Sequence, residues 1–137
     1  MPSSRMPFLL AIACLLIAGP ALAGAPEWAA VADEETVHVI TTDEDGDVRE
    51  TKIWLLVLDD VGYIRTSRGT RWGDNVERNP DIALRVSGAD YPLRATFVEE
   101  DAERARIVAG FEAKYGSNPI MNWIRGDDPR IMRLDPR

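Results

Sequence analysis

The chain has 137 residues, 16 of them basic and 23 acidic, and its net charge is −7. This length supports a single domain with a modest hydrophobic core. The acidic balance argues against general nucleic-acid binding, which requires a basic surface. The single cysteine, Cys14, excludes an intrachain disulfide.

The first 23 residues have the pattern of a cleaved signal peptide. Arg5 supplies a positive start, residues 8–18 form an apolar run, and residues 21–23 read Ala-Leu-Ala, a small-x-small cleavage site. The apolar run is shorter than the roughly 20 residues that span a bilayer. We therefore expect cleavage after Ala23, no stable membrane anchor, and a periplasmic or secreted product without Cys14. A retained anchor is the alternative.

Short strands separated by turns are expected in the rest of the chain. Residues 36–42 alternate and are rich in β-branched side chains, and the Asp45-Gly46 pair favours a hairpin turn after them. Residues 53–58 are continuously apolar, as in a strand that is buried on both faces. The patterns predict strands at residues 36–42, 48–58, 63–67, 82–86, 91–99 and 130–134, and helices at 26–35, 72–78 and 101–115.

The longest helix is predicted over residues 101–115, where apolar side chains such as Phe111 recur on one face and Gly116 ends the helix. Residues 117–129 read as a loop with a turn of helix at 120–124. Six short strands in one small domain must close on themselves or stack as two sheets. We therefore expect a mainly β fold of the α+β type, a small six-stranded antiparallel barrel with one long helix and short helices. The predicted parts are a signal peptide (1–23), an N-terminal segment (24–35) and the barrel domain (36–137).

One segment concentrates positive charge on this acidic chain. Arg65, Arg68 and Arg71 fall within seven residues with no acid between them, and the segment passes Gly69 before it enters a predicted helix. Guanidinium groups, hydroxyls and the N–H groups of a helix N-terminus all suit an anionic phosphate. Trp72 offers a flat face for an aromatic ring. Pairing of these arginines with surface carboxylates is an equally good interpretation.

Several short motifs follow one another over residues 36–136. They are Thr-Lys-Ile-Trp-Leu-Leu at 51–56, Tyr-Ile-Arg-Thr-Ser-Arg at 63–68, Arg-Trp at 71–72, Asn75, and Asn-Pro at 79–80. Their order resembles the pyridoxamine-phosphate-oxidase-like split barrels, nearest the deazaflavin-dependent nitroreductase branch and related uncharacterised small proteins. The resemblance implies a split β-barrel that binds a small molecule and forms a homodimer.

The resemblance also implies a flavin site. Such barrels place a basic residue at the start of the second strand, a hydroxyl pair at the end of the third, and a phosphate-binding loop before the helix. The cofactor would be FMN or a deazaflavin coenzyme, whose ring performs hydride transfer. The protein would then be an exported reductase of quinones, nitro compounds or similar small acceptors. The residues matched to cofactor-binding positions are Lys52, Trp54, Thr66, Ser67, Arg68, Arg71, Trp72 and Asn75, and no catalytic residue or metal ligand is assigned.

Two other functions stay open. A non-catalytic split barrel would use its pocket for haem or a lipophilic ligand, with His38, the single histidine, as the candidate iron ligand. Ordinary packing or surface placement of His38 on its strand is favoured over a ligand role, because one histidine without a cysteine partner is a poor ligand set. A structural domain that binds another protein is the third hypothesis.

Overall fold

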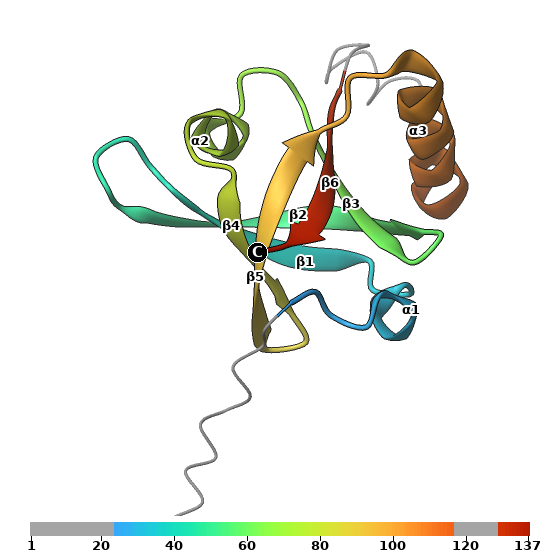
Figure 1. Cartoon of the computed structure of the whole chain (residues 1–137), viewed down its shortest axis with the longest axis horizontal. Helices are drawn as coiled ribbons and strands as arrows, with labels where there is room; N and C mark the ends of the chain where they lie inside the picture. Colours follow the sequence, from blue (N-terminus) through green and yellow to red (C-terminus); the bar gives the residue numbers. More distant parts are fainter. Residues whose placement is uncertain (1–23, 117–128) are drawn as a thin grey trace, which may run out of the picture.

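The computed structural model describes residues 24–116 and 129–137. Within these residues, six antiparallel strands form a closed barrel in the order β1-β2-β3-β6-β5-β4, and three helices surround it (Figure 1). The predicted mainly β fold is therefore confirmed. The elements are α1 (Trp28–Val31), β1 (Thr36–Thr42), β2 (Val48–Leu58), β3 (Val61–Thr66), α2 (Arg71–Arg78), β4 (Asp81–Val86), β5 (Ala89–Phe97), α3 (Asp101–Tyr115) and β6 (Arg130–Pro136).

The predicted signal peptide and the predicted turn of helix at 120–124 lie outside the described residues. In the part of the chain that is described, none of the helices has the length and apolar character needed to cross a membrane.

β2 is the longest strand, and it changes partner along its length. Its first part pairs with β1 as far as the Thr36–Trp54 pair, and its last part pairs with β3 from the Leu55–Ile64 pair onward. β1 also pairs with β4, which closes the barrel. Trp54 and Leu55 therefore stand where β2 passes from one neighbour to the other.

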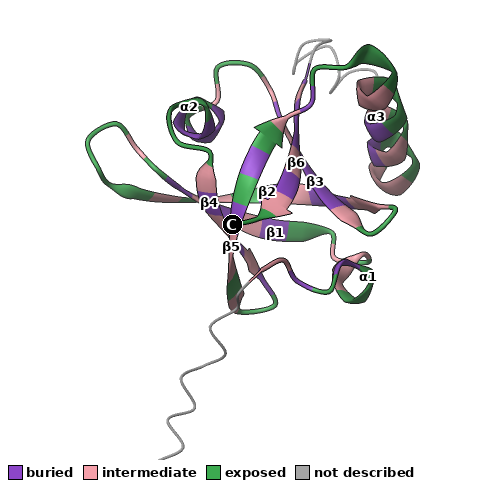
Figure 2. Cartoon of the chain, viewed as in Figure 1, coloured by how far each residue is buried: buried purple, intermediate pink, exposed green. Residues whose placement is uncertain are grey.

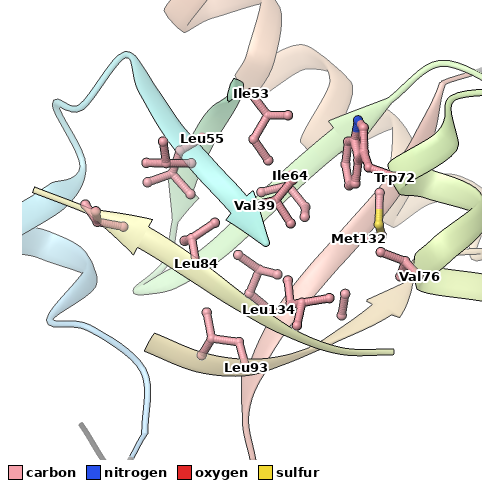
Figure 3. Packing of buried hydrophobic residues seen from close by; sticks show 14 of the residues in the cluster. Val39, Ile53, Leu55, Ile64, Trp72, Val76, Leu84, Leu93, Met132 and Leu134 are labelled. Atoms are coloured by element: carbon pink, nitrogen blue, oxygen red, sulfur yellow. The ribbon is translucent and has the colours of Figure 1, made fainter. Parts of the chain in front are cut away.

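Alternating apolar side chains fill the barrel. In β1 and β4 every second residue is buried, as expected when one face of each strand points inward. Trp72 and Val76 of α2 pack against one end of this core. Figure 3 shows the packing of the core residues Val39, Ile53, Leu55, Ile64, Leu84, Leu93, Met132 and Leu134 with these two.

α1 contributes one large side chain to the same core. Trp28 is buried, and its ring lies against Gly62 of β3, where a Cβ atom would overlap three ring carbons. α1 and α2 lie on opposite sides of the barrel (Figure 1). The helix predicted over residues 26–35 is wrong in its extent, because the carbonyl groups of Ala32 and Glu34 accept hydrogen bonds from Lys114 Nζ and the chain turns toward β1.

α3 covers the outer face of β2, β3 and β6. Its buried residues Ile107 and Phe111 pack on Leu56, Tyr63 and Ile131, which point away from the barrel interior. Figure 2 shows the buried stripe of α3 facing the strands. The helix begins at Asp101, because the Glu100 carboxylate accepts hydrogen bonds from the backbone N–H groups of the first turn.

Two hairpins turn within two residues, and the strand after each turn begins earlier than the sequence pattern predicts. Asp59 and Asp60 have φ values of 48° and 64°, and Ser87 and Gly88 have 50° and 80°. Two consecutive residues with positive φ make the two-residue turn that matches the twist of the flanking strands. Consequently β3 begins at Val61 and β5 at Ala89, each two residues earlier than predicted.

Candidate functional site

Two clefts lie beside α2. The strand cleft has a volume of about 210 Å³, and its lining residues are Lys52, Ile53, Trp54, Arg65, Thr66, Ser67, Thr70 and Trp72. The acidic cleft has a volume of about 560 Å³, and its lining residues are Asp43, Glu44, Asp45, Arg71, Asp74, Asn75 and Arg78. The two therefore differ in charge: the strand cleft is lined by two cations and the acidic cleft mainly by carboxylates.

The residues matched to a cofactor site fall into three groups. Arg68 lines neither cleft and is exposed on the loop between β3 and α2. Arg71 and Asn75 line the acidic cleft. The structure brings together Lys52, Trp54, Thr66, Ser67 and Trp72 in the strand cleft.

Arg65 joins the strand cleft although the family resemblance assigns it no cofactor contact. The β2–β3 pairing ends at the Leu55–Ile64 pair, and Trp54 and Arg65 are the next residues of the two strands on that side. Lys52 lies two residues before Trp54 and shares its side of β2. The sequence signal for this arrangement is a single charged residue, Arg65, directly after the apolar Ile64; in the structure Ile64 is fully buried and Arg65 only partly.

Trp54 is held in place by α3. Its ring stacks on the Tyr115 ring with 4.2 Å between centroids and 3° between planes. The Tyr115 hydroxyl lies 2.7 Å from the Glu35 carbonyl and 2.6 Å from the Leu55 carbonyl, and it accepts a hydrogen bond from Leu55 N–H at 3.0 Å. Burial raises the pKa of Tyr115, so its proton stays available for these bonds. The ligand would therefore meet a preorganised indole.

Lys114, next to Tyr115 at the C-terminal end of α3, also holds this helix against the barrel. Its Nζ donates to the carbonyl oxygens of Ala32, Glu34 and Leu55 at 3.0, 2.6 and 2.7 Å. Desolvation by burial lowers the pKa of Lys114, and the nearby acidic residues Asp33, Glu34 and Glu35 oppose that shift. Together with Tyr115, this side chain satisfies the backbone of β2 at Leu55, just beyond the Thr36–Trp54 pair where the pairing with β1 stops.

Two threonines give the strand cleft an adjustable donor. Thr66 Oγ1 lies 2.5 Å from Thr70 Oγ1 and 3.2 Å from the Ser67 carbonyl oxygen. A hydroxyl has one proton, so Thr66 can donate to either acceptor. When it donates to Thr70, the Thr70 proton is left to bind an anion in the cleft.

Arg130 fastens α2 beside this threonine pair. It pairs with Thr66 in the β3–β6 register, and its guanidinium forms ion pairs with Asp74 at 3.3 Å and Glu77 at 3.6 Å. A Cβ atom on Gly73 would overlap the Arg130 guanidinium and the Thr70 hydroxyl. The first turn of α2 therefore needs glycine to approach β3 and β6 this closely.

In the acidic cleft, Asn75 connects α2 to the end of β1 through hydrogen bonds. Its amide nitrogen donates to Thr41 Oγ1 at 3.0 Å and to Asp43 Oδ1 at 2.8 Å, and its amide oxygen accepts from Arg78. Arg49 also donates to both oxygens of Asp43 at 2.8 and 3.0 Å. These bonds tie α2 to β1 and to the turn that follows it.

Asp43 should make the protein sensitive to acid. Hydrogen bonds from Arg49 and then Asn75 lower the pKa of Asp43 from 3.8 to about 2. The folded state therefore binds this proton less readily than the unfolded state, so the stabilisation is complete above pH 3.8 and is lost as the pH falls through about 2. Asp43→Asn should lose less stability than the parent between these values in urea unfolding at several pH values. Glu44→Gln, in the same turn, is the control. If the free energy of unfolding of Asp43→Asn falls with pH as steeply as that of the parent, Asp43 is not the group responsible.

His38 lies on the outer face of β1, directly across from Lys52 of β2. Its Nδ1 is 2.5 Å from Glu50 Oε1, and Arg85 donates to the same oxygen at 3.0 Å. The hydrogen bond with His38, followed by the charge of Arg85, lowers the pKa of Glu50. If Nδ1 carries the proton, Nε2 is the nitrogen that can bind a metal ion.

The fold is that of the pyridoxamine-phosphate-oxidase-like split barrels. Residues 27–134 match the model of the family described as "Uncharacterized protein conserved in bacteria (DUF2255)", and the chain belongs to this family. No curated protein matches the chain at a significant level.

Solved structures share the fold at low sequence identity. HutZ from Vibrio cholerae, described as a heme storage protein, is 20% identical with a TM-score of 0.63, over 82% of this chain and 89% of HutZ. A Listeria innocua protein described as a candidate pyridoxamine 5'-phosphate oxidase is 12% identical with a TM-score of 0.61, over 80% of this chain and 89% of that protein. ChuZ from Campylobacter jejuni is 19% identical with a TM-score of 0.61, over 75% of this chain but only 48% of ChuZ.

Proposed function

We propose that the protein binds a flat aromatic cofactor with an anionic tail in the strand cleft. The observation that carries the proposal is the lining of this cleft, where Lys52 and Arg65 lie with Trp54 and Trp72. The indole rings suit an aromatic ring system, and the two cations suit a phosphate or carboxylate. In one protein chain the cleft is smaller than a typical cofactor pocket, so it would hold part of the ligand.

Haem bound without catalysis is the first candidate. The description of the structural neighbour HutZ as a heme storage protein supports it. Lys52 and Arg65 would pair with the two propionates, and His38 is the residue that would bind the iron. Glu50 would hold the His38 ring in the tautomer that has Nε2 as the ligand atom.

An exported reductase is the second candidate, with FMN or a deazaflavin coenzyme as cofactor and quinones or nitro compounds as acceptors. The likeness to the Listeria innocua protein and the hydroxyls of Thr66, Ser67 and Thr70 support it. A bound flavin would supply hydride transfer. The protein's own residues would hold the phosphate, flank the ring with Trp54 and exclude water on that side.

Titration of the purified full-length protein with haem and with FMN tests both candidates. Haem should produce a shifted Soret band that is weakened in His38→Ala and kept in Arg94→Met, a surface variant on β5. FMN should lose fluorescence on binding, because indoles quench flavins. Failure of both ligands to bind more tightly than about 1 mM, only about 4 kcal/mol of binding free energy, would end the proposal.

Export and dimer formation are also proposals. The Arg5 start, the apolar run and the Ala-Leu-Ala site support cleavage after Ala23, so sequencing of the secreted or periplasmic protein should begin at Gly24. A homodimer would let a second chain complete a cleft that is small in one chain. Light scattering should then give twice the mass of the mature chain.

A further inference from the structure

We infer that Arg65 determines ligand specificity in the strand cleft, where it and Lys52 together hold an anionic group of two negative charges. This inference rests on the proposed function and assigns the anion to the strands. The loop and helix arginines Arg68 and Arg71, which the family pattern favours, would not be the main contacts.

The placement of the three arginines carries the first step. Arg65 is half-buried on β3 and lines the same cleft as Lys52 and Trp54. Its register partner on β6 is Ile131, which is fully buried. The aliphatic part of Arg65 therefore begins beside an apolar side chain. Arg68 is exposed and lines neither cleft. Arg71 lines the acidic cleft instead.

The charges of the two clefts carry the second step. Four carboxylates and two guanidiniums line the acidic cleft, so an anion at Arg71 would also face Asp43, Glu44 and Asp74. Among the described residues, those that line the strand cleft include two cations and no carboxylate. A concave surface lined by one sign of charge concentrates the electric field inside it. Arg49 and Arg130 offset part of the negative charge of the acidic cleft by pairing with Asp43 and Asp74, and an anionic group should still prefer the strand cleft.

The donor geometry defines the ligand class. A guanidinium offers two parallel N–H groups that match two oxygens of a phosphate, while an ammonium acts as a point charge. The Thr66–Thr70 pair adds a neutral donor at the same place. A phosphate monoester carries about −1.5 to −2 charges at pH 7, so it fits this set better than a single negative charge. The two propionates of haem offer the same total charge.

The experiment compares ligands that differ only in the anionic group. FMN and riboflavin share one ring system, and only FMN has the phosphate. The parent protein should bind FMN about 10- to 100-fold more tightly than riboflavin. Arg65→Met should remove most of this preference while leaving riboflavin affinity within about twofold, and Arg65→Lys should restore part of it. Haem and its dimethyl ester provide the same comparison for carboxylates.

Arg71→Met and Arg68→Met are the matched controls, and each should keep the preference within about threefold. Circular dichroism and urea unfolding confirm that all variants are folded. Equal loss in Arg65→Met and Arg71→Met, or loss in Arg71→Met alone, would overturn the assignment to Arg65. Equal binding of FMN and riboflavin by the parent would overturn the inference but leave ring binding in place. Binding of none of the four ligands would overturn the proposed function as well.

Discussion

Replacing Gly62 with alanine should lower the free energy of unfolding by about 3–5 kcal/mol. Gly62 is buried on β3, and a Cβ atom there would overlap the Trp28 ring. The strand is paired on both sides, with β2 and with β6, so it has little room to move. Trp28 comes from a helix of only four residues, so the cheapest adjustment is for the indole to leave the core. The cost should therefore approach that of deleting the buried ring.

A double-mutant cycle checks this explanation by urea unfolding. Trp28→Ala alone should cost about 3–5 kcal/mol. Adding Gly62→Ala to Trp28→Ala should cost less than about 1 kcal/mol more, because the overlap is gone. Gly46→Ala is the control, since a Cβ there meets no atom within 4 Å, although its φ of 93° adds some strain. Additive costs in the cycle would show that Gly62 is needed for another reason.

Replacing Phe111 with alanine should also cost about 3–5 kcal/mol. Phe111 is 1% exposed and forms the centre of the cluster between α3 and the outer face of β2, β3 and β6. Its ring also packs near the Tyr115 ring, with 6.1 Å between centroids. The loss should loosen the end of α3 that supports Trp54. Hydrogen exchange of the α3 amides should then speed up more than that of β1 or β4.

Tyr115→Phe separates the core packing of α3 through Phe111 from its support of Trp54 and β2 through Tyr115. This variant keeps the ring stack on Trp54 and removes the hydroxyl that bonds Leu55 and Glu35. It should cost about 1–2 kcal/mol. A cost for Phe111→Ala no larger than that for Tyr115→Phe would contradict the central place given to Phe111.

The strand pattern of this chain could be predicted because hydrophobic alternation is a local signal. The bounds of β1, β2 and α3 agree with those predicted at residues 36–42, 48–58 and 101–115. The start of β3 was predicted two residues late, because a glycine that closely follows two aspartates is typical of a turn. In the structure Asp59 and Asp60 alone make the turn, and Gly62 lies within β3. A glycine is needed there because the Trp28 ring occupies the space of a side chain.

Which residues line which cleft could not be predicted from local sequence patterns. Arg71 and Trp72 are neighbours in sequence, but successive residues of a helix point about 100° apart. One lines the acidic cleft and the other the strand cleft. Arg65 and Lys52 come together only through the pairing of β2 with β3, which depends on the tight turn at Asp59 and Asp60. Tertiary register, rather than motif order, therefore decides which cations share a cleft.

Ligand titration followed by nuclear magnetic resonance of the tryptophan indole N–H groups tests the central claim most directly. Trp54 and Trp72 line the strand cleft, whereas Trp28 packs against Gly62 on the other side of the barrel. Saturating FMN or haem should shift the Trp54 and Trp72 signals and leave the Trp28 signal in place. Saturable binding that moves the amides of Asp43, Glu44 and Asp74 while both cleft indoles stay unchanged would place the ligand elsewhere and contradict the proposal.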